Sequence, residues 1–174
     1  ASAAGYDYAV IGELADQVIL MAHDYDPRDA SQFVGTNYYY HNFATAPIRE
    51  VYLGLRYITQ QVDASKILLG YSCRSVAWQL DNEGKLISGT PVYPTTDTVA
   101  KRLAQADTEI EWSDEYQQPY AIYQTEDGSR YILWYQDDAS IQVSMNAAKL
   151  LGVTGTSIWR LGTIPQGDWN WNIT

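Results

Sequence analysis

Two segments of this sequence place chemically versatile side chains directly after apolar, strand-like runs. His23 and Asp24 follow Val18-Ile19-Leu20-Met21, and Trp159 closes a β-branched segment that has glycines on both sides. A carboxylate accepts hydrogen bonds, an imidazole donates or accepts them, and an indole offers a flat apolar face with a polar edge. The flat face of an indole suits stacking against a sugar, whose ring has an apolar C–H face and a polar rim.

The composition points in the same direction and excludes some partners. The 174 residues include 15 Tyr and 6 Trp but only 2 Phe, a balance that suits stacking on sugars and is also common in secreted β structure. The net charge of −10 and the pI of about 4.4 disfavour nucleic acid and anionic membranes. No run approaches the roughly 18 apolar residues of a membrane helix. We therefore expect neither nucleic-acid nor membrane partners.

Metal and cofactor chemistry has little support in the sequence. There is no Cys-x-x-Cys, His-x-x-x-His or glycine-rich phosphate loop, and Cys73 is the only cysteine. Asp24-Tyr25-Asp26 begins like a calcium loop, but Asp29 occupies the position where that loop needs glycine. We expect no metal and no cofactor.

The order of predicted elements indicates an α/β fold. The pattern of residues 8–15 is typical of a short helix. The apolar runs over residues 17–22 and 66–71 are typical of strands that are covered on both faces. A helix predicted over residues 47–62 lies between the two strands, after a long polar and aromatic loop over residues 23–46. A strand, a helix and a strand in this order form a βαβ unit, which predicts parallel pairing.

The pattern changes after residue 75 and returns after residue 135. Glycine-containing turns predict hairpins around residues 82–84 and 126–128. Between these hairpins the sequence predicts a helix over residues 95–106, which Asp97 would cap, and a strand over residues 108–112. A helix over 138–151 and a strand over 153–159 follow. We therefore divide the chain into residues 1–75, an α+β insertion at 76–135, and residues 136–174.

Three strand ends together resemble glycoside hydrolase family 18, especially its spore-germination and cortex-lytic type. Met21-Ala22-His23-Asp24 is similar to the Met-x-Tyr-Asp signature after the family's sixth strand. Lys66–Tyr71 resembles the seventh strand, and Ser157-Ile158-Trp159-Arg160-Leu161-Gly162 the eighth. Many members carry an α+β subdomain between the last two strands. The resemblance implies the last three strands of a (β/α)8 TIM barrel with that insertion, because a whole barrel needs about 250 residues.

The resemblance also implies a reaction. Family members hydrolyse β-1,4 bonds next to N-acetylglucosamine with retention, and the substrate's own acetamide oxygen is the nucleophile. The acid is the glutamate of Asp-x-x-Asp-x-Asp-x-Glu on the fourth strand, and this pattern does not occur in the 174 residues. Asp81-Asn82-Glu83 contains a shorter match but lies on a predicted turn. We therefore expect no catalytic residue in this chain and place the acid outside it.

The resemblance transfers substrate-binding roles to residues at the three strand ends. Asp24 would contact the sugar and position its acetamide, and His23 stands where the family has a tyrosine that hydrogen-bonds this group. Trp159 would form the floor under the scissile sugar. The remaining predicted substrate-binding residues end or follow the first two strands: Met21, Tyr71 and Trp78.

Several alternatives stay open at this point. The chain is either part of such a hydrolase or a non-catalytic carbohydrate-binding or cell-wall-binding module. Tyr38, Tyr39 and Tyr40 either form a sugar-binding rim or pack the loop down, and His41 is expected to be exposed. The partner implied by the resemblance is a polysaccharide containing N-acetylglucosamine, in a secreted, cell-wall or spore-associated location. Open strand edges predict self-association.

Overall fold

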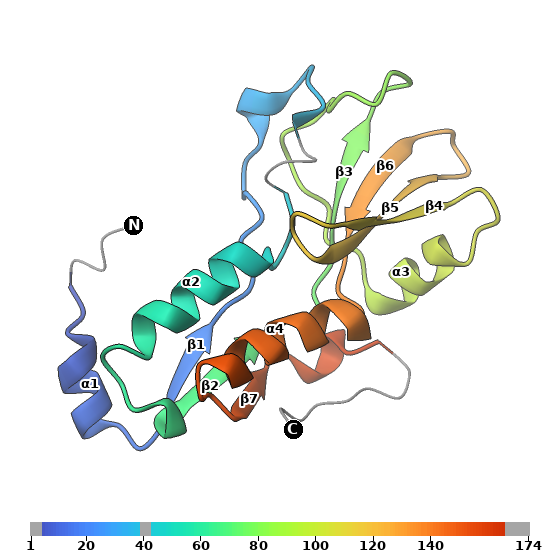
Figure 1. Cartoon of the computed structure of the whole chain (residues 1–174). Helices are drawn as coiled ribbons and strands as arrows, with labels where there is room; N and C mark the ends of the chain where they lie inside the picture. The colour runs from blue at the N-terminus through green and yellow to red at the C-terminus, as the bar shows by residue number, and fades with distance from the viewer. Residues whose placement is uncertain (1–4, 39–42, 166–174) are drawn as a thin grey trace.

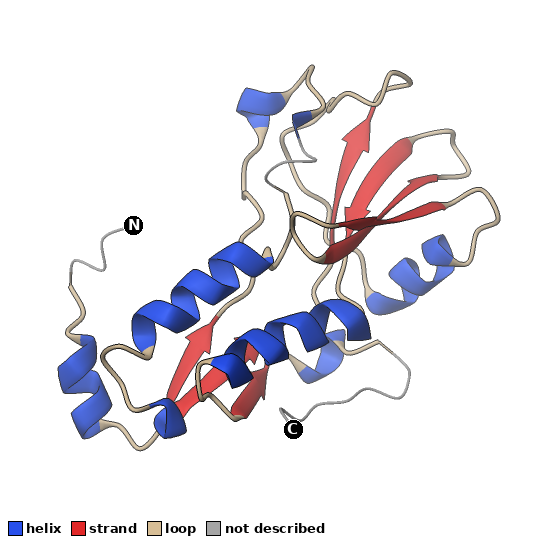
Figure 2. Cartoon of the chain, viewed as in Figure 1, coloured by secondary structure: helices blue, strands red, loops and turns tan. Residues whose placement is uncertain are grey.

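The computed structural model describes residues 5–38 and 43–165, which form a mixed α/β fold with two sheets (Figures 1 and 2). The first part contains α1 (Tyr8–Leu14), β1 (Val18–Met21), η1 (Ser31–Phe33), α2 (Ile48–Ile58), η3 (Ala64–Lys66) and β2 (Ile67–Tyr71). The middle part contains β3 (Val76–Leu80), α3 (Thr96–Leu103), β4 (Glu109–Ser113), β5 (Gln118–Gln124) and β6 (Arg130–Trp134). The last part contains α4 (Asp138–Leu150), β7 (Gly155–Ile158) and η4 (Leu161–Thr163).

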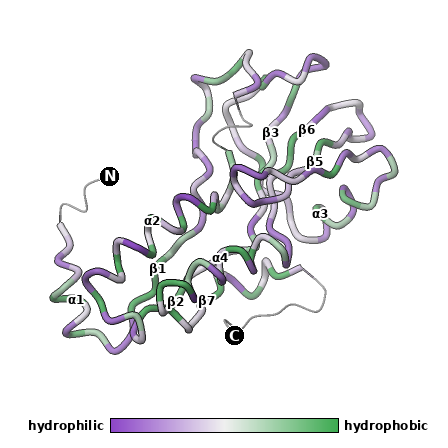
Figure 3. The backbone as a smooth tube through the Cα atoms, viewed as in Figure 1, coloured by the Kyte–Doolittle hydropathy of each residue, from purple (hydrophilic) through white to green (hydrophobic). Residues whose placement is uncertain are grey.

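The first sheet is parallel and has the strand order β1-β2-β7. Leu68 at its centre pairs with Ile19 on one side and with Gly155 on the other, which confirms the predicted parallel βαβ unit. Helices α2 and α4 lie together on one face of this sheet, and Figure 3 colours β2 and parts of α4 as apolar. The core between them includes Val51, Leu55, Ile67, Leu69, Ile141 and Met145.

The other face of the parallel sheet is open at β1. The side chains of Ile19 and Met21 are 52% and 71% exposed, whereas Val18 and Leu20 pack against the core. The prediction that this strand is covered on both faces is therefore wrong. The described helices cover one face only, and alternation along the strand sends every second side chain to the other face.

The second sheet is antiparallel and has the order β3-β6-β5-β4. Val99 and Leu103 of α3 pack on one face, and Phe43 from the long loop packs on the other, with its ring centroid 4.5 Å from that of Trp78. The predicted hairpin around 126–128 is confirmed as β5 and β6. The predicted hairpin around 82–84 also forms, with a short second arm: Leu80 bridges Leu86, and the amide of Ile87 donates to the carbonyl of Gln79 at 3.1 Å, on the edge of β3 that β6 leaves free.

Local end signals of the helices differ in detail from the sequence prediction. Helix α3 begins after Thr95, whose side chain accepts a hydrogen bond from the amide of Thr98, while Asp97 lies in its first turn. Helix α2 follows Pro47 and ends at Ile58. These shifts leave the order of the elements unchanged.

A buried amide links the two sheets. The side chain of Gln118 on β5 is fully buried, donates to Thr45 Oγ1 at 2.8 Å and to the carbonyl of Tyr135 at 2.9 Å, and accepts from the amide of Ala46 at 3.0 Å. Thr45 and Ala46 precede α2, which covers the parallel sheet. Since buried polar groups are costly without partners, this satisfied amide fixes the antiparallel sheet against the start of α2.

Candidate functional site

The carboxyl ends of the three parallel strands meet at one edge of the sheet (Figure 1). The ladder continues past the strands: the amide of Ala22 donates to Gly70 at 3.1 Å, and that of Trp159 donates to Tyr71 at 2.8 Å. Residues 22–26, 72–74 and 159–160 therefore lie together, and we call them the carboxyl edge. Binding sites of parallel α/β proteins form at such edges.

A cluster of three charged side chains organises this edge. Arg74 donates from Nε to Oδ1 of Asp24 at 2.8 Å and from Nη2 to Oδ1 of Asp26 at 2.5 Å. Its guanidinium also lies 4.6 Å from the centroid of the Tyr93 ring. Asp24 has a φ of +61°, a left-handed conformation that Asp tolerates better than most residues. The planar guanidinium thus fixes both carboxylates in position.

The two carboxylates respond differently to their surroundings. Partial burial would raise the pKa of Asp24, but contacts with His23 and Arg74 together outweigh it, so its pKa lies below the usual value. The side chain of Asp26 is 1% exposed, and burial raises its pKa in spite of Arg74. Asp24 therefore stays ionised at neutral pH and accepts hydrogen bonds only.

His23 stands beside this cluster. Its side chain is 8% exposed, and its Nδ1 lies 3.4 Å from Oδ2 of Asp24. This distance is long for a hydrogen bond, and Nδ1 has no hydrogen-bond partner among the described residues. Protonation of the imidazole would turn this contact into an ion pair with Asp24.

The structure brings some predicted site residues to the surface and buries others. Trp159 is 59% exposed, and Met21 at the end of β1 is 71% exposed. Tyr71 is 5% exposed and packs in the core beneath α2 and α4, where burial raises its pKa to about 12. Its contribution to the carboxyl edge is the carbonyl that accepts from Trp159.

The prediction that Trp78 lines a cleft is wrong. Its side chain is completely buried in the antiparallel sheet, against Phe43. Alternation along β3 directs it to the face that the long loop covers. Trp134, on the neighbouring strand β6, is also completely buried, whereas Trp112 on β4 is 36% exposed.

The aromatic loop is only partly described. Tyr38 is 43% exposed and stacks on Phe33, with ring centroids 4.8 Å apart. Tyr39, Tyr40 and His41 lie outside the described residues. Within residues 5–38 and 43–165, no three His, Cys, Asp or Glu side chains gather as metal ligands, and no helix is long and apolar enough to cross a membrane.

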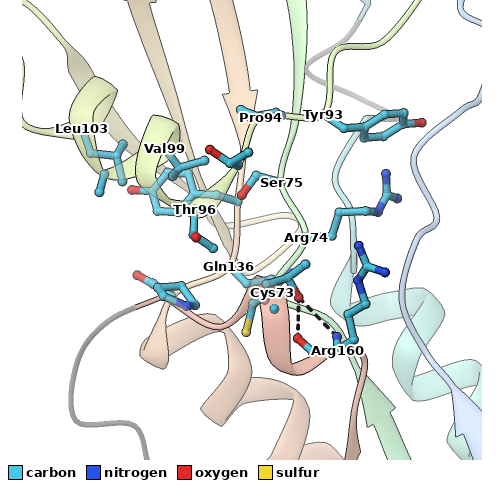
Figure 4. Close-up of a pocket in the computed structure, with 17 residues that line it drawn as sticks. Cys73, Arg74, Ser75, Tyr93, Pro94, Thr96, Val99, Leu103, Gln136 and Arg160 are labelled. Carbon is cyan, nitrogen blue, oxygen red and sulfur yellow. Dashed lines mark hydrogen bonds between the residues drawn. The ribbon is translucent and has the colours of Figure 1, made fainter.

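Sequence reasoning missed Arg74, Asp26 and a pocket beside them. The pocket has a volume of about 420 Å³ and lies between α3, the junction of β6 and α4, and the chain after β7 (Figure 4). Arg74 and Arg160 both line it. The available signal was that each arginine follows the end of a predicted strand within three residues, as Asp24 does.

These elements define a class of protein. It has a mixed α/β fold, and acidic and aromatic side chains form a site at the carboxyl edge of its parallel strands. Residues 1–163 match the family model for glycosyl hydrolases family 18, and the chain therefore belongs to this family. It is 28% identical over 172 residues to the cortical fragment-lytic enzyme of Bacillus subtilis (strain 168), covering 95% of this chain and 35% of that enzyme. The chain thus spans about a third of the length of this relative.

Solved structures share the fold. The spore cortex-lytic enzyme SleL of Bacillus megaterium QM B1551 superposes with a TM-score of 0.67 at 24% identity, covering 92% of this chain and 34% of that one. The family 18 chitinase of Cycas revoluta, solved in complex with (GlcNAc)3, gives a TM-score of 0.68 at 18% identity, covering 88% and 44%. At these identities the likeness concerns the fold.

Proposed function

We propose that this chain is the C-terminal part of a family 18 enzyme that hydrolyses β-1,4 N-acetylglucosamine linkages in chitin or peptidoglycan. The reaction is retaining and substrate-assisted, and the glutamic acid that protonates the leaving oxygen lies outside the chain. Its absence from the 174 residues, and the 35% coverage of the Bacillus subtilis relative, support this division.

The observation that carries the proposal is the carboxyl edge itself. Asp24, held by Arg74, and the exposed Trp159 come from the first and last strands of one parallel sheet and lie at the same end of it. An ionised carboxylate and an exposed indole are the pair of groups that bind the polar rim and the apolar face of a sugar.

Each residue then has a role in positioning the substrate. Trp159 forms the floor beneath the scissile sugar, and Asp24 accepts a hydrogen bond that orients the acetamide for attack on the anomeric carbon. His23, in the place of the family's tyrosine, donates a hydrogen bond to the same group. Met21 borders this subsite from β1. The chain thus supplies orientation, which lowers the entropic part of the barrier.

The architecture follows the same division. Residues 1–75 and 136–174 supply the last three strands of a TIM barrel, and residues 76–135 form the α+β insertion. The exposed side chains of Ile19 and Met21 support this assignment, because they lie on the face that would point into a closed barrel. The parent enzyme acts at the cell wall or the spore cortex, as the name of the Bacillus megaterium relative suggests.

Hydrolysis assays test whether the catalytic acid lies outside this chain. The pure 174-residue chain is expected to release no product from N-acetylglucosamine oligomers or cortex fragments. The longer parent protein is expected to cleave them, and mutation of the glutamate in its Asp-x-x-Asp-x-Asp-x-Glu strand would abolish this cleavage. Robust hydrolysis by the chain alone would contradict the proposal.

Binding tests the site within this chain. Calorimetry with N-acetylglucosamine tetramers should show that Trp159→Ala weakens binding at least about fivefold, since the stacking of a ring on an aromatic side chain contributes on the order of 1–3 kcal/mol. Trp112→Ala, at a partly exposed tryptophan on β4, is the matched control and should leave affinity unchanged. Equal losses in both variants would contradict a site at Trp159.

The second candidate function is a non-catalytic carbohydrate-binding or cell-wall-binding module. The observation that favours it is the lack of the catalytic pattern in the whole sequence. The gene sequence upstream of Ala1 distinguishes the two functions. An upstream segment that encodes a β-strand with Asp-x-x-Asp-x-Asp-x-Glu supports the enzyme, and a start codon at that point supports the module.

A further inference from the structure

We propose that the pocket lined by Arg160, the residue after Trp159, binds the acidic substituent of a muramic acid residue, with Arg160 as its charge partner. This inference rests on the proposed function and adds a preference for peptidoglycan over chitin. Muramic acid differs from N-acetylglucosamine by a lactyl ether, which ends in a carboxylate or continues as a peptide with a carboxylate of its own.

The pocket is large enough for such a substituent and has one apolar side. Its volume is about 420 Å³, and four separate segments line it. Pro94, Val99 and Leu103 from the α3 region supply apolar surface, which would contact the methyl group of a lactyl or alanyl unit. In Figure 4 Val99 and Leu103 lie on one side of the pocket, and the guanidinium groups of Arg74 and Arg160 lie on the other.

The two arginines that line the pocket differ in their carboxylate partners. Arg74 is paired with Asp24 and Asp26. The carboxylate of Asp137 accepts the amide of Ser140 and caps α4. Arg160 has no carboxylate within ion-pair distance among residues 5–38 and 43–165. Its guanidinium is exposed and can therefore pair with a carboxylate of a ligand.

The position of Arg160 connects the pocket to the sugar site. It follows Trp159 directly, and its backbone is held by reciprocal hydrogen bonds with the Thr163 side chain, at 3.2 and 2.8 Å. The wall of the pocket thus begins one residue after the proposed sugar-stacking side chain. A guanidinium binds a carboxylate through two parallel hydrogen bonds, which adds direction to the attraction.

Three ligands separate the sources of the anion. Calorimetry of the 174-residue chain would compare N-acetylglucosamine tetramer, an alternating glucosamine–muramic acid tetramer with free lactyl carboxylates, and the same tetramer bearing stem peptides. We expect at least one muramic ligand to bind about tenfold more tightly than the chitin tetramer, as a charge-assisted contact of about 1.4 kcal/mol requires. A preference shown only by the peptide-bearing ligand assigns the peptide carboxylate.

Variants at one position test the role of charge. Arg160→Gln should remove the preference and leave the affinity for the chitin tetramer unchanged. Arg160→Lys should keep part of the preference, which separates loss of charge from a local disturbance of the chain. Arg56→Gln, at an exposed arginine on α2, is the control and should change neither affinity.

The outcomes also separate this inference from the proposed function. Equal binding of all three ligands, or a preference that survives Arg160→Gln, would overturn the inference while the sugar site stands. No binding of any ligand would contradict the sugar site and the inference together. A preference that weakens with rising salt and disappears in Arg160→Gln would support the inference.

Discussion

Arg74 and Asp24, fifty positions apart, are joined by a hydrogen bond of 2.8 Å across the ends of β1 and β2. The same guanidinium binds the buried Asp26, so one cation holds two carboxylates of the loop after β1. The position of Asp24 in the candidate site therefore depends on Arg74, which holds this carboxylate in place.

Replacement of Arg74 is expected to be costly and pH-dependent. Arg74→Met leaves the buried carboxylate of Asp26 without its cation, and removal of one partner from such a pair typically costs 3–5 kcal/mol. Burial already raises the pKa of Asp26, and loss of Arg74 raises it further. The penalty should shrink as the pH falls through this raised pKa, because protonation then removes the buried charge. Urea unfolding at pH 7 and pH 5 measures the difference.

Arg49 provides the control for this variant. Its side chain is 77% exposed and lies 2.9 Å from Glu50, also at the surface. Arg49→Met should change the free energy of unfolding by about 0.5 kcal/mol or less at either pH. Similar losses of unfolding free energy for Arg49→Met and Arg74→Met would contradict this prediction, because the cluster of Asp24, Arg74 and Asp26 would then stabilise the fold no more than a surface ion pair does.

The buried amide of Gln118 should matter for stability beyond its own sheet. Gln118→Leu leaves the Ala46 amide and the Tyr135 carbonyl without this partner, at about 1–3 kcal/mol for each buried unsatisfied group. Thermal unfolding measures the loss. Gln60→Leu, at an exposed position after α2, should stay within about 0.5 kcal/mol of the parent; a comparable loss there would contradict the linking role.

Alkaline titration should report three buried tyrosines. Burial raises the pKa values of Tyr71, Tyr116 and Tyr135 to about 12, with smaller contributions from Cys73, Glu115 and Asp137. In the unfolded chain a tyrosine titrates near 10. Their contribution to stability is complete below that pH and is lost as the pH rises toward 12.

The measurement is tyrosinate absorbance followed together with circular dichroism. A late absorbance step should coincide with unfolding, and Tyr71→Phe should reduce its amplitude without changing the spectrum at neutral pH. A single step near pH 10 in the folded protein would contradict the burial of these hydroxyls.

Self-association is expected to depend on the open face of the parallel sheet. Strands β1 and β7 form its two edges, and Ile19 and Met21 are exposed on one face. Unpaired edges beside apolar surface pair readily with another chain. Light scattering should detect oligomers of the isolated chain, and Ile19→Lys should reduce them.

Leu53 on α2 gives a matched comparison, since it is 39% exposed and lies outside the parallel sheet. Leu53→Lys should leave the oligomeric state unchanged. A strictly monomeric parent chain, or an equal effect of both substitutions, would contradict association through the sheet.

The sequence was sufficient for the order and type of the elements but not for their faces. Alternation and turn residues located the hairpin at 126–128 and the parallel unit of β1, α2 and β2. Exposure of Ile19 and Met21 was not predictable, since a short apolar run looks the same whether one face or both are covered. Trp78 was misplaced for a related reason: Phe43, which covers it, lies far away in the sequence.

The candidate site could be predicted in part. Asp24 and Trp159 follow strands, and their proximity follows from parallel pairing alone. The role of Arg74 required the register between β1 and β2 and the path of the chain after each strand, which no local pattern encodes. The pocket at Arg160 is formed by four segments, and only the folded chain brings them together.

The insertion of the antiparallel sheet between β2 and β7 has a consequence for how the chain acquires its structure. β1 and β2 become available early during synthesis, but Leu68 meets Gly155 only after residues 72–154 have been made. The hairpin of β5 and β6 closes locally and can form in that interval. Until β7 arrives, one edge of β2 stays unpaired, so a nascent chain that stalls in this interval is the form most exposed to aggregation and to chaperones.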